Sequence, residues 1–135
     1  MLSSNHDILV TTPINQIKHA AREAAACIKH GGGYYFRKFA RLPKLLRTGE
    51  TKIFYVEDGY IRGFGVVTNT AWRGYMTDEV SGEEWGAGYY IAIPADTWTW
   101  IRPIPYKGFQ GFRYWAGQKY EVVGNWLDPM PEAEG

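Results

Sequence analysis

The sequence predicts an α+β fold that is mainly β, in which one N-terminal helix packs against a small curled sheet or barrel. Three observations lead to this class: an apolar stripe at helical spacing near the N-terminus, two aromatic-rich β-type runs joined at Asp58-Gly59, and glycines inside the second run. A chain of 135 residues has the length of one domain with its own core. We expect a single domain over residues 1–135, with residues 1–7 and 128–135 mobile.

The N-terminal helix is expected over residues 13–30. Thr12-Pro13 is typical of a helix start, because the threonine hydroxyl accepts from free amides of the first turn and proline has no amide hydrogen to leave unbonded. The glycine run 31–33 ends the helix, since glycine readily adopts the left-handed capping conformation. The buried stripe consists of Ile14, Ile17, Ala21, Ala24 and Ile28, with Cys27 beside them.

The central hairpin is expected between Lys52 and Asn69, where the two β-type runs meet at Glu57-Asp58-Gly59. Asp-Gly between such runs is a strong hairpin signal, because glycine takes a positive φ angle at little steric cost. Gly63 and Gly65 interrupt the return run, and glycines inside a strand often mark a bulge or bend. We therefore expect this hairpin to form the centre of a curled sheet.

Shorter strands are expected on both sides of the hairpin. Ile8–Val10 and Tyr34–Ala40 precede it, the second with closely spaced aromatic residues. Thr70–Gly88 is expected to be a loop-like insertion, and loops of this length in compact domains are often functional. The remaining expected strands are Tyr89–Ile93 and Thr97–Ile104, joined as a second hairpin across Pro94-Ala95-Asp96, and the closing strand Tyr120–Val123.

Composition narrows the compartment and the chemistry. The single cysteine, Cys27, cannot form an internal disulfide, and the N-terminus lacks the pattern of a signal peptide. No apolar run approaches the roughly 20 residues that span a bilayer. We expect a cytoplasmic protein with no membrane partner. His6, His19 and His30 lack the paired spacing of a zinc site, so we expect no metal and no cofactor.

Basic residues concentrate before the hairpin. Nine Lys or Arg residues fall between Lys18 and Lys52 against two glutamates, although the whole chain carries a formal net charge of only +1. Such asymmetry produces a local positive field, which is the electrostatic footprint of a phosphate-bearing partner. The alternative is an edge strand that its cations protect from aggregation. The residues expected to grip phosphate are Arg37, Lys38, Arg41 and Lys44.

Aromatic residues dominate the second half of the chain. Trp98 and Trp100 are expected in the core, since aromatic side chains fill the interior of small β-barrels. Other aromatic residues stand in expected loops beside an arginine, and aromatic faces stack on splayed bases for roughly 1–3 kcal/mol each. Core or rim packing is the competing interpretation for each of them. The candidates for a base-binding pocket are Trp72, Arg73, Trp85, Arg113 and Trp115.

The run Gly108–Tyr114 is the most unusual short stretch. Its two glycines allow a backbone to approach a ligand closely, Gln110 offers hydrogen bonds to a base edge, and Phe109 or Phe112 offers a stacking face. A bulged barrel corner explains the glycines equally well. The GxxxxGK[ST] spacing of a phosphate-binding P-loop is missing.

The stretch Arg47–Val67, RTGETKIFYVEDGYIRGFGVV, resembles the PUA-like superfamily, whose members include PUA, ASCH and EVE domains. The shared pattern is a Gly-acidic turn, an aromatic-aliphatic strand, a tight turn, and a strand with glycines that ends in paired valines. The resemblance implies a curled β domain that binds RNA or recognises modified bases. The ASCH signature Gly-x-Lys-x-x-x-Glu is absent, so no site residue of that family transfers to this chain.

The sequence therefore predicts a nucleic-acid-binding domain whose partner is RNA or DNA, with a modified base as one form of the ligand. Arg62, in the hairpin, is a further candidate contact. One alternative is an ASCH-like hydrolase of RNA or modified nucleosides that uses Lys38 or Lys52 with a carboxylate. A second alternative is a protein-interaction module that uses the insertion Thr70–Gly88. The sequence leaves the oligomeric state open.

Overall fold

The computed structural model describes residues 6–11, 34–68, 71–77, 84–115, 119–128 and 131. The side chains of residues 34–38, 71–73, 75–77, 84–85 and 95 lie outside the description, so these residues are placed by their backbone alone. The elements of the described part are β1 (Ile8–Thr11), β2 (Tyr34–Phe39), β3 (Lys52–Glu57), β4 (Tyr60–Val66), β5 (Ala71–Thr77), β6 (Glu84–Pro94), the 3-10 turn η2 (Ala95–Thr97), β7 (Thr99–Pro105), β8 (Phe112–Tyr114) and β9 (Val122–Asn125).

The predicted α+β class is wrong, while its mainly β character is confirmed. In the described part of the chain the single helical element is η2, and no α-helix packs against a sheet. The helix expected over residues 13–30 lies outside the described residues. The described core is instead built by strands packing on strands and by aromatic residues of the connecting segments. No helix among the described residues is long and apolar enough to cross a membrane.

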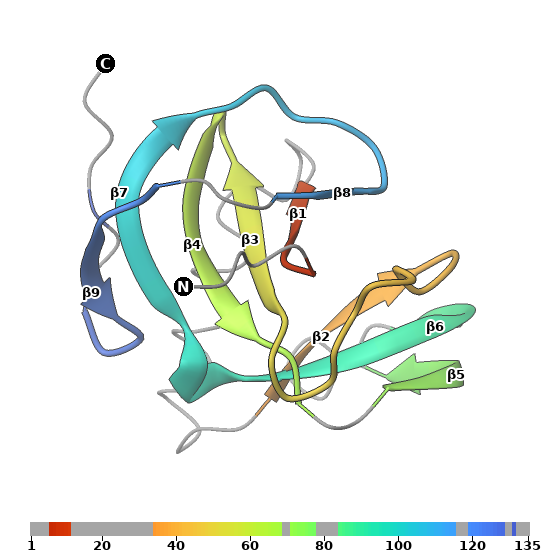
Figure 1. The fold of residues 1–135 in the computed structure, drawn as a ribbon. Coiled ribbons are helices and arrows are strands. Elements are labelled where there is room, and N and C mark those ends of the chain that lie inside the picture. Colours follow the sequence, from red (N-terminus) through yellow and green to blue (C-terminus); the bar gives the residue numbers. More distant parts are fainter. Residues whose placement is uncertain are drawn as a thin grey trace.

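The strands form two sheets. The six-stranded sheet has the order β8-β1-β3-β4-β7-β9, in which β1 and β3 are parallel and the other pairs are antiparallel. The three-stranded sheet has the order β2-β6-β5 and is antiparallel throughout. In Figure 1 the six-stranded sheet curls around the left and top, and the three-stranded sheet crosses below it. No pairing joins β8 to β9 in the described part, so the six-stranded sheet is curled and open.

The central hairpin is confirmed. β3 and β4 pair with Glu57 opposite Tyr60, and the turn residues Asp58 and Gly59 have φ angles of 54° and 81°. Positive φ at both central residues defines a type I′ turn, whose twist matches that of the strands it joins. The bulge expected near the glycines also occurs, because the register of β4 with β7 shifts between Ile61 and Gly63.

Alternating side chains bury both faces of the six-stranded sheet. One face packs against the three-stranded sheet in a cluster that we call the inter-sheet core: Ile8, Val10, Phe39, Ile53, Tyr55, Val67, Ile91, Ile93, Trp98 and Trp100. The other face carries the second core, which consists of Leu9, Phe54, Val56, Ile61, Phe64 and Ile101. The aromatic residues Tyr106, Phe109, Trp115 and Tyr120 cover the second core. The core positions predicted for Trp98 and Trp100 are confirmed, with 1% and 2% exposure.

Two expectations downstream of the hairpin are wrong. The segment Thr70–Gly88 is not a loop, because β5 and the start of β6 occupy most of it and pair from Ala71 to Thr77. β6 and β7 do not form a hairpin, since β6 pairs with β2 and β5 whereas β7 pairs with β4 and β9. The closing strand β9 begins two residues later than expected, at Val122.

The turn η2 carries the chain from one sheet into the other. The hydroxyl of Thr97 accepts from the backbone amide of Val66 at 3.0 Å and donates to the carbonyl of Pro94 at 2.7 Å. These bonds tie the corner between β6 and β7 to the end of β4. The chain therefore turns after Pro94, as its sequence predicts. The bond to β4 holds this turn so that the next strand, β7, joins the six-stranded sheet.

Candidate nucleic-acid interface

The segment 40–50, which we call the basic loop, joins β2 to β3 and presents cations to solvent. Arg41, Lys44 and Arg47 are exposed, whereas Leu42 and Leu46 pack against the inter-sheet core. Backbone bonds order the loop, among them Leu46 N to Pro43 O at 3.1 Å. Leucines thus anchor the loop to the core while its arginines and lysine extend outward.

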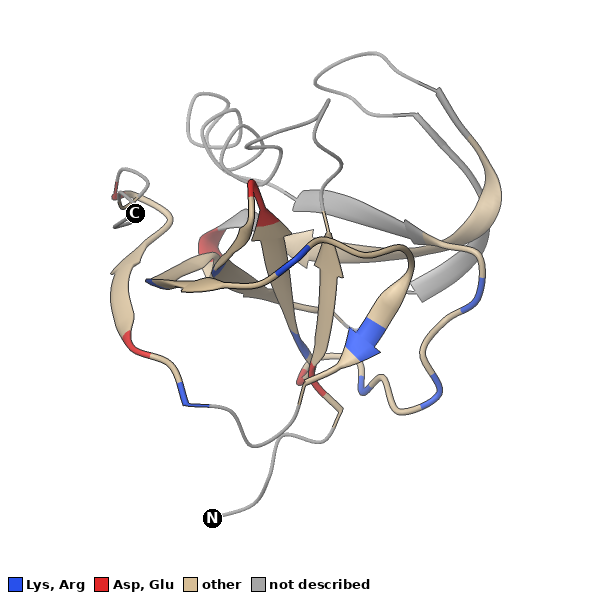
Figure 2. Ribbon diagram, turned by 90° about the horizontal axis from the view of Figure 1, so that it is seen from above, with Lys and Arg blue, Asp and Glu red and all other residues tan. Residues whose placement is uncertain are grey.

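The basic loop contacts the edge strand β8. The backbone amide of Leu45 donates to the hydroxyl of Tyr114 at 3.0 Å, across 69 residues of sequence. Figure 2 shows the basic residues of the loop in blue at the right. Beside them lies the short strand β8, which also carries a basic residue. The ring of Tyr114 packs edge-on against Phe112 at 5.5 Å, and Phe112 packs edge-on against the buried Phe39 at 6.0 Å. A series of edge-on ring contacts that begins in the core therefore positions the Tyr114 hydroxyl, which holds the loop.

A second group, which we call the arginine ledge, lies at the same edge strand and consists of Tyr106, Phe109 and Arg113. The guanidinium carbon of Arg113 lies 4.3 Å from the centre of the Phe109 ring and 5.9 Å from that of Tyr106. Nη1 of Arg113 donates to the Tyr106 hydroxyl at 3.2 Å. Alternation along β8 puts Arg113 and Tyr114 on opposite sides of the strand, so the ledge and the loop flank it. The ledge presents an exposed, positioned guanidinium plane.

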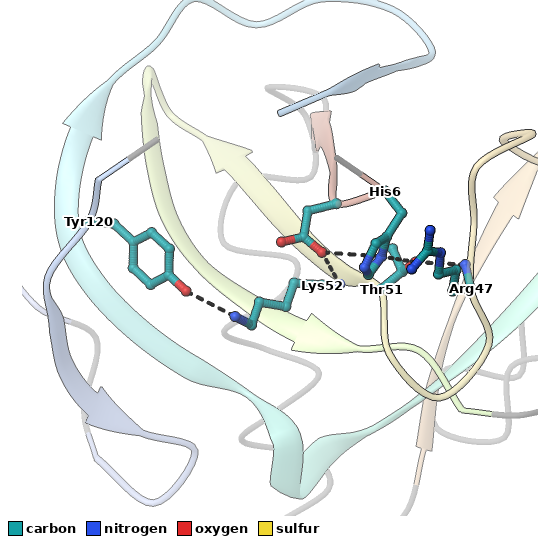
Figure 3. A network of polar contacts seen from close by, with 6 residues as sticks. His6, Arg47, Thr51, Lys52 and Tyr120 are labelled. Atoms are coloured by element: carbon teal, nitrogen blue, oxygen red, sulfur yellow. Dashed lines mark hydrogen bonds and ion pairs between the residues drawn. The ribbon is translucent and has the colours of Figure 1, made fainter. Parts of the chain in front are cut away.

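A third polar group lies where β3 begins (Figure 3). The buried Asp7 carboxylate accepts from the backbone amide of Lys52 at 2.9 Å. The Thr51 hydroxyl contacts Nδ1 of His6 at 2.9 Å and accepts from the backbone amide of Arg47 at 2.8 Å. These bonds join the N-terminal segment, the basic loop and β3 at one point. They explain why the loop has a defined path at its C-terminal end.

The Lys52 side chain extends from this point toward the second core. Its ammonium group donates to the Tyr120 hydroxyl at 3.1 Å and lies 5.4 Å from the centre of the Phe64 ring. The hydrolase alternative requires a carboxylate at such a lysine, and no carboxylate of the described residues lies within ion-pair distance of this ammonium. The partner is a phenol, which gives that alternative no support from Lys52. The side chain of Lys38 lies outside the description.

The residues predicted in the Gly108–Trp115 region divide into exposed and packed groups. Gln110 and Arg113 are exposed, while Phe109 and Phe112 are half-buried. Trp115 is also half-buried, with its ring edge-on to Phe54 at 4.6 Å and stacked with Tyr120 at 6.4 Å. The indole of Trp115 therefore covers the second core and does not stand open beside the ledge.

Arg62 is a predicted contact that the structure buries. It is 6% exposed, Nε donates to the carbonyl of Glu57 at 3.0 Å, and Nη2 lies 3.9 Å from the Asp58 carboxylate. Its guanidinium also lies 5.3 Å from the centre of the Tyr60 ring. Arg62 thus braces the turn of the central hairpin, and we leave it out of the candidate interface.

The remaining predicted contacts belong to the three-stranded sheet. Lys38 on β2 and Trp72 on β5 both stand opposite Tyr90 on β6, so they share one cross-strand row. The other members of this group are Arg37 on β2, Arg73 on β5 and Trp85 on β6. The side chains of all five lie outside the description, so the candidate interface rests on the basic loop and the arginine ledge.

Two residues that hold the candidate interface together carried no sequence signal of their own. Tyr114 is only one aromatic residue among many, and its partner Leu45 lies 69 positions away. Tyr106 likewise gains its role from Arg113, which folding brings near. The described residues include no group of three or more His, Cys, Asp and Glu side chains arranged to hold a metal ion.

Comparison with known proteins gives no relative for this chain. No protein-family model, no curated protein and no solved structure matches it. The argument for a function therefore depends on the geometry of the loop, the ledge and the edge strand between them.

Proposed function

We propose that this protein binds single-stranded nucleic acid, RNA in particular, on the surface formed by the basic loop and the arginine ledge. The observation that carries the proposal is the hydrogen bond from Leu45 to Tyr114, which holds the cations of the loop beside the strand that carries Arg113. Exposed arginines and lysines neutralise phosphates and release counterions, which supplies most of the affinity for a polynucleotide. The resemblance of the hairpin to PUA-like domains is the reason for preferring RNA.

The ledge gives the proposal its second component. An arginine guanidinium is a plane on which an unstacked base can lie, and the guanidinium carbon of Arg113 already lies over the Phe109 ring. The bond to Tyr106 fixes the plane before any ligand arrives, which lowers the entropy cost of binding. Gln110, exposed in the preceding turn, adds hydrogen-bonding groups for a base edge.

Fluorescence anisotropy with a labelled 12-nucleotide single-stranded RNA tests the proposal at several salt concentrations. The double variant Arg41→Ala/Lys44→Ala removes two exposed cations. The slope of log affinity against log salt is negative, and we expect its magnitude to decrease by about 1.4. Lys119→Ala, which removes an exposed lysine from a segment outside the interface, is the control and keeps the slope. No binding of wild-type protein to RNA, single-stranded DNA or a modified duplex at low salt contradicts the proposal.

A second pair of variants separates base stacking from charge. Arg113→Lys keeps the positive charge and loses the planar group, so we expect affinity to fall about tenfold with an unchanged salt slope. Arg113→Ala removes the charge as well as the planar group, so we expect it to lose more affinity at low salt and to show a shallower salt slope. Equal affinity of Arg113→Lys and wild type would show that the ledge takes no base. Oligonucleotides that carry one modified base, compared with unmodified ones, show whether the ledge recognises a modification.

A further inference from the structure

An open depression of about 360 Å³ lies beside the second core, against which its residues Ile104 and Tyr120 pack. It is formed where β7 and the segment 119–121 diverge, and its lining residues are Arg102, Pro103, Ile104, Lys119, Tyr120 and Glu121. The volume is at the lower end of the range for small-molecule sites, so it suits a ligand with a single ring. The contacts described above for the basic loop and the arginine ledge do not involve these residues.

The walls of the depression are mainly apolar and held in place. Pro103 and Ile104 contribute aliphatic surface, and Tyr120 contributes a ring. The Tyr120 hydroxyl is bonded to Lys52 and its ring packs against Trp115, so the ring is positioned from behind. A rigid apolar wall of this kind favours a flat hydrocarbon body, because binding immobilises no wall side chain.

The charge at the rim is unbalanced. Arg102 and Glu121 form a two-pronged ion pair, with Nε to Oε1 at 3.1 Å and Nη2 to Oε2 at 2.9 Å. The hydrogen bond and charge of Arg102 lower the pKa of Glu121, so this pair stays ionised and neutralises itself. Lys119 is exposed, and among the described residues no carboxylate forms an ion pair with it. The rim therefore offers one ammonium group to a ligand.

We infer that the depression binds a small aromatic anion, with its ring against Tyr120, Pro103 and Ile104 and its acidic group at Lys119. The size of the depression, its fixed apolar wall and the single uncompensated cation at its rim all fit this class of ligand. A carboxylate, a sulfonate and a phosphate ester share the required chemistry. The site is separate from the proposed nucleic-acid surface and does not depend on it.

Three probes that share a benzene ring test the inference: benzenesulfonate, benzamide and benzamidine, which are anionic, neutral and cationic. Titrations followed by the backbone amide signals of Ile104, Tyr120 and Glu121 should show saturable binding of benzenesulfonate with a Kd of about 1 mM. Benzamide should bind about two- to fivefold more weakly, because it lacks the ion pair with Lys119. Benzamidine should bind most weakly. Phenyl phosphate and benzoate then show which acidic group is preferred.

Charge reversal at the rim is the decisive variant. Lys119 is exposed, so Lys119→Glu should leave the fold intact while it reverses the order of the probes and makes benzamidine the best ligand. Lys44→Glu, a reversal at another exposed lysine that lies in the basic loop, is the control and should keep the wild-type order. Equal binding of the three probes, an unchanged order in Lys119→Glu, or amide shifts confined to other residues overturns the inference. None of these outcomes bears on RNA binding, which is measured separately.

Discussion

Gly63 occupies a position in β4 that leaves no room for a side chain. A Cβ atom at this residue would lie 2.4 Å from the carbonyl oxygen of Thr99 and 2.7 Å from a ring carbon of Trp98. Both neighbours are fixed, one as backbone of β7 and the other as a buried indole of the inter-sheet core. The bulge between Ile61 and Gly63 thus brings β4 against β7 more closely than any other amino acid permits.

We expect Gly63→Ala to lower the free energy of unfolding by about 1–3 kcal/mol, the usual cost of overpacking a core. Glycine loses more conformational entropy than alanine when a strand folds, which by itself would favour the variant. This gain is smaller than the cost of the clash. Urea denaturation followed by circular dichroism measures the change. The substitution should not alter the amide spectrum of β9 beyond the residues that pair with β7.

Gly108→Ala provides a control with a less demanding environment. Its Cβ would lie 3.1 Å from a methyl group of Thr11, which can move by a few tenths of an ångström. We therefore expect a change well below that of Gly63→Ala. Equal losses of unfolding free energy in the two variants would contradict this explanation. The close approach of β4 and β7 would then not be the cause of the loss in Gly63→Ala.

At the scale of elements, a polar contact inside an aromatic cluster joins the segment before β9 to β3, in addition to the bonds between Arg102 and Glu121. The ammonium group of Lys52 on β3 donates to the hydroxyl of Tyr120 at 3.1 Å, and the Tyr120 ring packs against Phe54, Phe64 and Trp115. The faces of the Phe64 and Tyr120 rings attract this ammonium group, whose nitrogen lies 5.4 Å and 5.8 Å from their centres. The contact therefore couples β3 to the chain that leads into β9.

A double-mutant cycle measures this coupling. Tyr120→Phe keeps the ring packing and removes the hydroxyl, Lys52→Met keeps most of the apolar stem and removes the ammonium, and the double variant completes the cycle. We expect a coupling free energy of about 0.5–1.5 kcal/mol from urea denaturation, as for other net hydrogen bonds. A coupling indistinguishable from zero would show that the bond between Lys52 and Tyr120 adds nothing to the ring packing and to the bonds of Glu121 with Arg102.

Local sequence signals predicted those elements whose partners are adjacent in the chain. Asp58-Gly59 fixed the hairpin of β3 and β4, since the turn geometry itself demands positive φ angles. The pairing of β1 with β3 in parallel was not predictable, because it joins Ile8 to Ile53 through a long connection. The hairpin predicted across Pro94 was wrong for the same reason. A turn at Pro94 is compatible with a hairpin, and the bond that ties this turn to β4 comes from Val66, which is distant in the sequence.

The candidate interface shows the same division. The cations of the basic loop and the run Phe109–Arg113 were visible in the sequence, because charge and short-range aromatic spacing are local properties. Their union at β8 was not visible, since it depends on Leu45 meeting Tyr114. Arg62 was predicted as a contact from its charge alone, and its burial against Glu57 followed from the turn. Sequence reasoning thus found the chemistry of the surface and missed which parts of it lie together.

At the scale of the whole molecule, the two sheets share one core. Ile91 and Ile93 of the three-stranded sheet are fully buried in the cluster that includes Tyr55, Trp98 and Trp100 from the six-stranded side. The bond from Thr68 N to Ala92 O adds a backbone link where β4 leaves the six-stranded sheet. Neither sheet keeps its apolar face covered if the other unfolds. Folding of the described part should accordingly be cooperative, with both sheets lost in one transition.

Ile93→Ala tests this cooperativity from the three-stranded sheet. Removal of a fully buried isoleucine side chain should cost about 2–5 kcal/mol, whereas Leu127→Ala, at a residue with 64% exposure, should cost far less. Amide signals of β3 and β6, followed separately through a urea titration, should disappear at one midpoint that shifts equally for both strands. If the β6 signals vanish at lower urea than those of β3, the three-stranded sheet unfolds by itself. The shared core would then not couple the two sheets. The basic loop, which runs from β2 into β3, would then begin in a sheet that unfolds before the rest of the described part.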